Sequence, residues 1–104
     1  MRFLLKVNIP NDAGNAAAKA GTLGSTIQKI LDEQKPESVY FTDNNGQRCG
    51  YLVIEMKEAS QIPSFCEPWF QALNAAIEMH PVMTPADLAK AADGIKQEVS
   101  RFAK

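Results

Sequence analysis

The chain has 104 residues, 45% of them hydrophobic, and its 11 basic and 12 acidic side chains leave a net charge of −1 at pH 7. This balance excludes a general electrostatic attraction to nucleic acid or to an anionic membrane, and no apolar run approaches the ~20 residues of a membrane span. We therefore expect one domain over residues 1–104, located in the cytoplasm, with neither nucleic acid nor a membrane as its partner.

The first third of the chain is predicted to contain a strand followed by an interrupted helix. Alternation over residues 2–9 favours a half-buried strand, and an alanine-rich helical segment follows it. Gly21 and Gly24 would each cost about 1 kcal/mol inside a helix, so we expect a break or a distortion there. Helical periodicity resumes at Leu23 and ends before Pro36, because the residue preceding a proline avoids the helical region.

Residues 38–56 predict a β-hairpin. Residues 38–42 are mostly β-branched or aromatic, which favours a strand. Asn45-Gly46 tolerates the positive φ angles of a type I′ turn, and residues 48–56 form the expected return strand.

A second helix is predicted over residues 60–73, because apolar side chains recur there on one face: Ile62, Phe65, Cys66, Trp69, Phe70 and Leu73. Pro68 lies inside this segment, so the helix should be kinked there or begin anew near Ser64. In the second case Ser64 and Glu67 would form a capping box.

Alternation over residues 76–82 predicts the last strand, which contains His80, the only histidine of the chain. Thr84 followed by Pro85 is typical of a helix N-cap and the first helical position. One helix is expected to run from there to about Phe102, with Asp87 near its positive end.

The predicted order is therefore β-α-β-β-α-β with an added C-terminal helix. Right-handed crossover connections convert this order into a four-stranded antiparallel sheet with two helices on one face. This is the ferredoxin-like arrangement of the α+β class.

The strand periodicity divides the predicted sheet into two faces. The helix-covered face should be apolar, whereas the opposite face is mixed and carries Leu4, Lys6, Asn8, Tyr40, Thr42, Tyr51, Val53, Glu55, Glu78, His80 and Val82. A monomer would rarely expose an apolar patch of this kind. Because two-fold homodimers dominate soluble oligomers, we expect a homodimer in which a second copy covers this face.

The element order, together with Glu67-Pro68-Trp69-Phe70 and Glu78-Met79-His80-Pro81-Val82-Met83, resembles the dimeric α/β-barrel superfamily. That superfamily includes muconolactone isomerase-like proteins, antibiotic-biosynthesis monooxygenase-like proteins and many small bacterial proteins of unknown function. The resemblance implies a homodimer in which two sheets pack face to face. The cofactor-free monooxygenases of the group are similar in using an Asn, a Trp, a Tyr and an Arg around an aromatic substrate, and Trp69 and Asn74 match two of these residue types.

His80 is the first candidate for chemistry, because imidazole is the side chain that most readily exchanges protons at neutral pH. Glu78 should share its face about 7 Å away along the strand. Lys6 or Asn8, on a neighbouring strand, could complete a catalytic polar cluster. The alternative is that His80 is a hydrogen-bonded interface residue, and that Lys6 and Glu78 are charges that fix the register of the dimer.

A second candidate is an apolar ligand pocket between helices and sheet. If the helices stand off the sheet, Trp69, Phe65, Tyr51 and Met79 would line it. The alternative is that Trp69 belongs to the core.

Other chemistries lack the residues that they require. Cys49 and Cys66 are isolated, so we expect no metal site and two core thiols, and no cofactor is predicted. Residues 21–26 lack the lysine of a phosphate-binding loop, and a flexible helix break is the simpler interpretation. RNA-binding domains share the topology, but Leu5 stands at one of the positions where they carry a stacking aromatic ring.

Two functions remain open. The first is a homodimeric small-molecule-binding protein, which in its catalytic form is a cofactor-free enzyme acting on a small aromatic or carbonyl compound. The second is a non-catalytic dimeric module for structure or interaction, whose uncovered sheet face serves only to associate. The sequence leaves open whether a pocket lies under the helices or between the two sheets.

Overall fold

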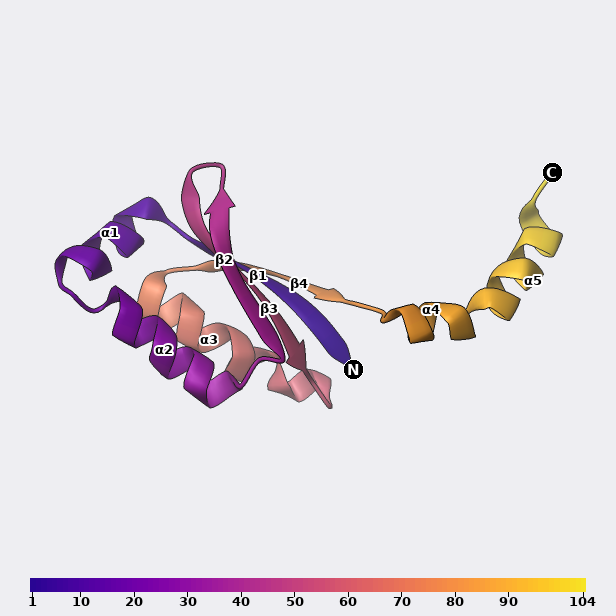
Figure 1. The fold of residues 1–104 in the computed structure, drawn as a ribbon, viewed down its shortest axis with the longest axis horizontal. Helices are drawn as coiled ribbons and strands as arrows, with labels where there is room; N and C mark the ends of the chain where they lie inside the picture. Colours follow the sequence, from indigo (N-terminus) through magenta and orange to yellow (C-terminus); the bar gives the residue numbers. More distant parts are fainter.

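The computed structural model describes residues 1–104 and contains one sheet with helices beside it (Figure 1). The strands are β1 (Arg2–Ile9), β2 (Ser38–Asn44), β3 (Gln47–Glu55) and β4 (Ala76–Pro81). The helices are α1 (Asn11–Lys19), α2 (Leu23–Gln34), α3 (Ile62–Leu73), α4 (Pro85–Lys90) and α5 (Ala92–Phe102), with a 3-10 turn, η1 (Ala59–Gln61), before α3.

The sheet has the strand order β2-β3-β1-β4, and every neighbouring pair is antiparallel. The two crossovers, through α1–α2 and through α3, bring these helices to the same side of the sheet (Figure 1). This arrangement confirms the predicted ferredoxin-like α+β fold with a four-stranded antiparallel sheet and an added C-terminal helical segment.

The core lies between the sheet and helices α2 and α3. Its ten buried members come from both layers: Leu5, Val7, Ile9, Ile30, Leu52, Ile54, Met56, Trp69, Leu73 and Ala75. Burying a large aliphatic or aromatic side chain contributes about 1.5–3 kcal/mol. This one-sided cluster is therefore the main source of stability, and it leaves the other face of the sheet without a covering layer.

Two predicted interruptions are confirmed. α1 ends at Lys19 and α2 begins at Leu23, and between them Gly21 has a φ of 75°, which a residue with a side chain rarely adopts. α2 then ends at Gln34, where Lys35 takes a left-handed conformation before Pro36.

The predicted hairpin is also confirmed. Asn45 and Gly46 have φ angles of 52° and 81°, the two positive values that a type I′ turn requires. The first strand is longer than predicted, because it runs on to Asn44, and the return strand begins and ends one residue earlier than predicted, so that Asn44 pairs with Gln47 directly beside the turn.

The second helix differs from the prediction at its start. It begins at Ile62 and continues through Pro68 to Leu73, so it does not begin anew near Ser64. The capping box is formed earlier, by Glu58 and Gln61 around the 3-10 turn. Because Ser64 already lies inside the helix, its hydroxyl donates to the Gln61 carbonyl at 2.8 Å instead of capping a helix start.

The C-terminal helix is two helices and not the single predicted one. α4 ends at Lys90 and α5 begins at Ala92, with Ala91 between them. The predicted start is confirmed, because Thr84 and Asp87 form a reciprocal capping box with Pro85 in the first turn. We call residues 85–102 the arm. None of the helices is both long enough and apolar enough to cross a lipid bilayer.

The arm makes the molecule elongated. It extends away from the sheet on the side opposite to α1–α3 (Figure 1), and the molecule measures 59 × 28 × 21 Å. Its radius of gyration is 17.5 Å, whereas a compact domain of this length has about 13 Å. The arm therefore finds little of its own chain to pack against.

Candidate functional site

The sheet face that the helices leave uncovered carries a row of four polar or aromatic side chains, one from each strand. In the register of the sheet Tyr40 lies opposite Tyr51, Tyr51 opposite Lys6, and Lys6 opposite Glu78. Directly opposed residues have Cβ atoms about 4.5–5.5 Å apart. Two phenols, an ammonium and a carboxylate therefore form one continuous line across the sheet, which we call the open-face row.

His80 lies two residues after Glu78 on β4 and therefore on the same face of the sheet. Its Nε2 lies 3.5 Å from Oε2 of Glu78, so the two predicted candidates are on the same face and in contact. Both side chains are more than half exposed, at 61% and 63%. Water therefore screens the pair, and it adds little to the stability of the fold. The side chains are free to meet a ligand or a partner.

Asn8 lies beside the row and connects β1 to the β2–β3 hairpin. Its Nδ2 donates to Oε1 of Gln47 at 2.5 Å, and its Oδ1 accepts from Nδ2 of Asn44 at 3.0 Å. These bonds hold the Asn8 amide in place next to a shallow depression of about 190 Å³, which is lined by Lys6, Asn8, Asn44, Ala76, Ile77 and Glu78. Of the predicted polar cluster, Lys6, Asn8 and Glu78 therefore share one depression, and His80 joins them only through its contact with Glu78.

Cys49 also belongs to this face, although it was not among the residues predicted there. It lies opposite Asn8 and Thr42, two positions before Tyr51, and is only 1% exposed. Burial raises the pKa of its thiol, and the carboxylate of Glu78 adds to the effect while Lys6 opposes it. The side chain therefore packs as a neutral thiol between the polar neighbours. The alternation that placed Tyr51 on this face would have placed Cys49 there as well.

Trp69 and Phe65 lie on the other side of the sheet from the open-face row. Trp69 is fully buried, its Nε1 donates to Oε1 of Gln34 at 3.2 Å, and Phe65 packs against the same core. Tyr51 points to the open face, away from both. The structure therefore does not bring Trp69, Phe65 and Tyr51 together in one apolar pocket under the helices.

The site is polar and aromatic and has no metal-binding arrangement. No group of three or more His, Cys, Asp or Glu side chains lies close enough to hold a metal ion. What the row offers is an acid–base pair, a cation and two phenols on one surface. This set can bind a flat ring against the phenols and exchange a proton with a polar group of the same ligand.

The fold and the open face define a small α+β domain with a ferredoxin-like sheet and one uncovered side. Residues 1–96 match the family described as "Domain of unknown function (DUF3303)", and the chain belongs to that family.

Among solved structures, the chain is similar to a formyltetrahydrofolate deformylase from Pseudomonas putida KT2440, with 13% identity and a TM-score of 0.48. That likeness covers 79% of this chain and 29% of the deformylase, so the chain spans less than a third of the length of that protein. No curated protein matches the chain.

Proposed function

We propose that this protein is a homodimeric small-molecule-binding protein of the dimeric α/β-barrel type, whose open-face row binds a small aromatic or carbonyl compound. The observation that carries the proposal is the alignment of Tyr40, Tyr51, Lys6 and Glu78 across all four strands, with His80 in contact with Glu78. A row of this composition on an uncovered face has no role in the packing of the core.

Tyr51, Lys6 and the His80–Glu78 pair each have a chemical role in this proposal. The Tyr51 ring is half-buried and offers a flat surface for an aromatic ring. The Lys6 ammonium is the donor for a carbonyl or carboxylate oxygen. The His80–Glu78 pair is the acid–base couple, because the carboxylate lies 3.5 Å from Nε2 of the imidazole and can hold the ring on the open face beside a ligand.

A second copy of the chain is needed to complete the site. The depression beside Lys6 has a volume of about 190 Å³, below the roughly 300 Å³ at which ligand pockets begin. A facing sheet would supply the missing wall and exclude water, which strengthens every charge interaction inside.

The second candidate function is a non-catalytic dimeric module. It is favoured by the same small volume, because two sheets that pack without a gap would leave no room for a ligand. In that case Lys6, Glu78 and His80 set the register of the interface.

Ligand titration followed by NMR tests the proposal. Benzoate and 4-hydroxybenzaldehyde at millimolar concentration are expected to shift the amide signals of Lys6, Tyr51 and Glu78, and Lys6→Met should weaken benzoate binding several-fold. Lys29→Met, on the exposed surface of α2, is the matched control and should leave binding unchanged. Absence of shifts at the row with both probes would contradict a ligand site there.

Sedimentation tests the dimer separately. The wild-type chain is expected to sediment as a dimer at micromolar concentration, and Tyr51→Lys should dissociate it by placing a charge at the centre of the interface. Gln28→Lys adds the same charge on the exposed helix surface and should not. With the dimer intact, loss of probe binding in His80→Ala favours the first function, whereas no consequence favours the module.

A further inference from the structure

The arm carries an apolar stripe that its own chain does not cover. Leu88, Ile95, Val99 and Phe102 recur at helical spacing along one side and are 52–68% exposed. Every residue of the arm is exposed except Ala91, which is half-buried. Such a stripe is typical of a helix that packs against another element.

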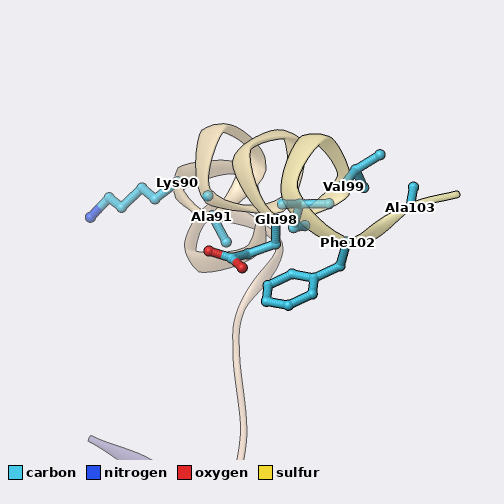
Figure 2. Close-up of a pocket in the computed structure, with 8 residues that line it drawn as sticks. Lys90, Ala91, Glu98, Val99, Phe102 and Ala103 are labelled. Atoms are coloured by element: carbon cyan, nitrogen blue, oxygen red, sulfur yellow. The ribbon is translucent and has the colours of Figure 1, made fainter.

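The stripe borders an apolar depression of about 830 Å³. This depression is lined only by residues of the arm and by Ala103, the residue that follows it. Figure 2 shows Val99 and Phe102 projecting from the helix with no other part of the chain across from them. Ligand pockets enclose most of their ligand on several sides. A hollow with a single helical wall is therefore a docking surface and not a small-molecule site.

The exposed area of the chain indicates how large the missing contact is. The accessible surface is 7137 Å² for a mass of 11.4 kDa, roughly a quarter more than the ~5,800 Å² of a monomeric protein of this mass. The difference exceeds the ~800 Å² that each partner buries in a standard protein interface. The uncovered surface is thus sufficient for a stable dimer.

The link between β4 and the arm directs the arm away from its own sheet. Residues 82–84 lie between Pro81 and Pro85, whose rings fix φ. The Val82 amide donates to the Arg2 carbonyl at 3.1 Å, which continues the ladder past β4, and the capping box fixes Thr84 in an extended conformation with ψ of 166°. In this conformation the link, which reaches roughly 10 Å, leads the arm away from the sheet (Figure 1).

We propose that the arm crosses to a second copy of the chain and packs its apolar stripe on the edge strand β2 of that copy. Tyr40 on the open face and Phe41 on the helix-covered face of β2 are 73% and 52% exposed, so this edge strand exposes an aromatic ring on each of its two sides. Natural proteins cover exposed edge strands, often with a helix. The arm supplies such a helix with matching apolar side chains.

The geometry of a two-fold pair places the arm at this edge. When two sheets face each other about an axis parallel to the strands, the rotation brings β4 of one copy over β2 of the other, because these strands form opposite edges of the sheet. The arm begins directly after β4 and therefore starts beside the partner's edge. Since Tyr40 is the first member of the open-face row, each arm would also close one end of the partner's site.

This inference rests on the proposed dimer, and NMR on mixed-label samples tests it. In a dimer refolded from equal parts of ¹³C-labelled and unlabelled chain, isotope-filtered spectra should contain intermolecular contacts between the methyl groups of Ile95 or Val99 and the rings of Tyr40 or Phe41. A dimer in which the arm contacts only its own chain, only the partner's arm, or nothing would overturn the inference and leave the proposed dimer intact.

Charge substitutions in the full chain provide a second test. The Ile95→Lys/Val99→Lys variant should raise the dimer dissociation constant at least ten-fold in sedimentation experiments. Gln97→Lys/Ser100→Lys adds the same charge on the opposite side of α5 and should change it less than two-fold.

Equal effects of the two pairs would overturn the role of the stripe. If the stripe variant dissociates and Tyr51→Lys does not, the arm contact stands while the sheet-face dimer fails. If the wild-type chain is a monomer at micromolar concentration, the arm contact and the sheet-face dimer are both wrong.

Discussion

Trp69 and Gln34 join helices α3 and α2 by a hydrogen bond from the indole Nε1 to the amide Oε1, at 3.2 Å. The same amide uses its Nε2 to donate to the Phe65 carbonyl at 2.8 Å, in the turn of α3 that precedes Trp69. Gln34 therefore satisfies two polar groups of α3 from the last residue of α2. The pair explains how a fully buried tryptophan can keep its N–H paired inside an otherwise apolar core.

Gln34→Ala should lower the free energy of unfolding by about 1–3 kcal/mol, because the buried indole N–H loses its partner and the Phe65 carbonyl loses its side-chain donor. Urea unfolding monitored by the fluorescence of Trp69, the only tryptophan of the chain, measures the change. Gln28→Ala, which removes only an exposed bond to Asp32, should stay within about 0.5 kcal/mol of wild type. Equal stability of the two variants would contradict the structural role of Gln34.

Gly50→Ala should destabilise the sheet by about 1 kcal/mol, because its Cβ would lie 2.9 Å from Cε1 of Phe41 on the neighbouring strand. In a Phe41→Ala background the same change should be neutral or stabilising, since alanine restricts the unfolded chain. A double-mutant cycle from urea unfolding measures this coupling. Gly24→Ala, whose Cβ would meet open space, is the control. An unchanged penalty without Phe41 would show that the ring is not the cause.

The sheet was predictable because its signals are local. Alternation placed Lys6 and Glu78 on one face, and Asn45-Gly46 fixed the hairpin register that aligns Tyr40 with Tyr51. Since the period of a strand is two residues, one correct register determines which side chains face each other across the sheet. The open-face polar cluster could therefore be predicted from the sequence.

The helices were less predictable, because their ends and partners depend on tertiary contacts. Pro68 removes one backbone bond, yet α3 continues because Trp69 and Leu73 pack in the core on its far side. The sequence alone did not decide whether Trp69 lines a pocket or lies in the core. The partner of its indole N–H is Gln34, which comes from a distant part of the chain. The direction of the arm was not predictable either, since no periodicity describes the link of residues 82–84.

Acid should weaken the start of the arm. The backbone N–H of Thr84 donates to Oδ2 of Asp87 at 3.0 Å, and this bond, with a smaller contribution from the Thr84 side chain, lowers the pKa of Asp87. Because the folded pKa lies below the unfolded value, the carboxylate stabilises α4 above about pH 4, and this stabilisation is lost as the pH falls through the folded pKa.

A carboxyl ¹³C titration of Asp87 measures this effect, and its midpoint should lie below the ordinary 3.9 or so of an aspartate. Thr84→Ala should move the midpoint only part of the way back, since the backbone donor remains. A midpoint at the ordinary value in the wild-type chain would show that the capping box does not form in solution.

Both cysteines should react slowly in the folded protein. Cys49 on the open face and Cys66 in α3 are 1% and 7% exposed, and burial raises the pKa of each thiol. A raised pKa lowers the thiolate fraction, and closed packing limits access, so labelling by a disulfide reagent at pH 7.5 should be roughly ten-fold or more slower than in urea. The single variants Cys49→Ala and Cys66→Ala assign the two rates. If Cys49 reacts as fast in the folded chain as in urea, its thiol is accessible from the open face, and the neutral, packed role assigned to it there is wrong.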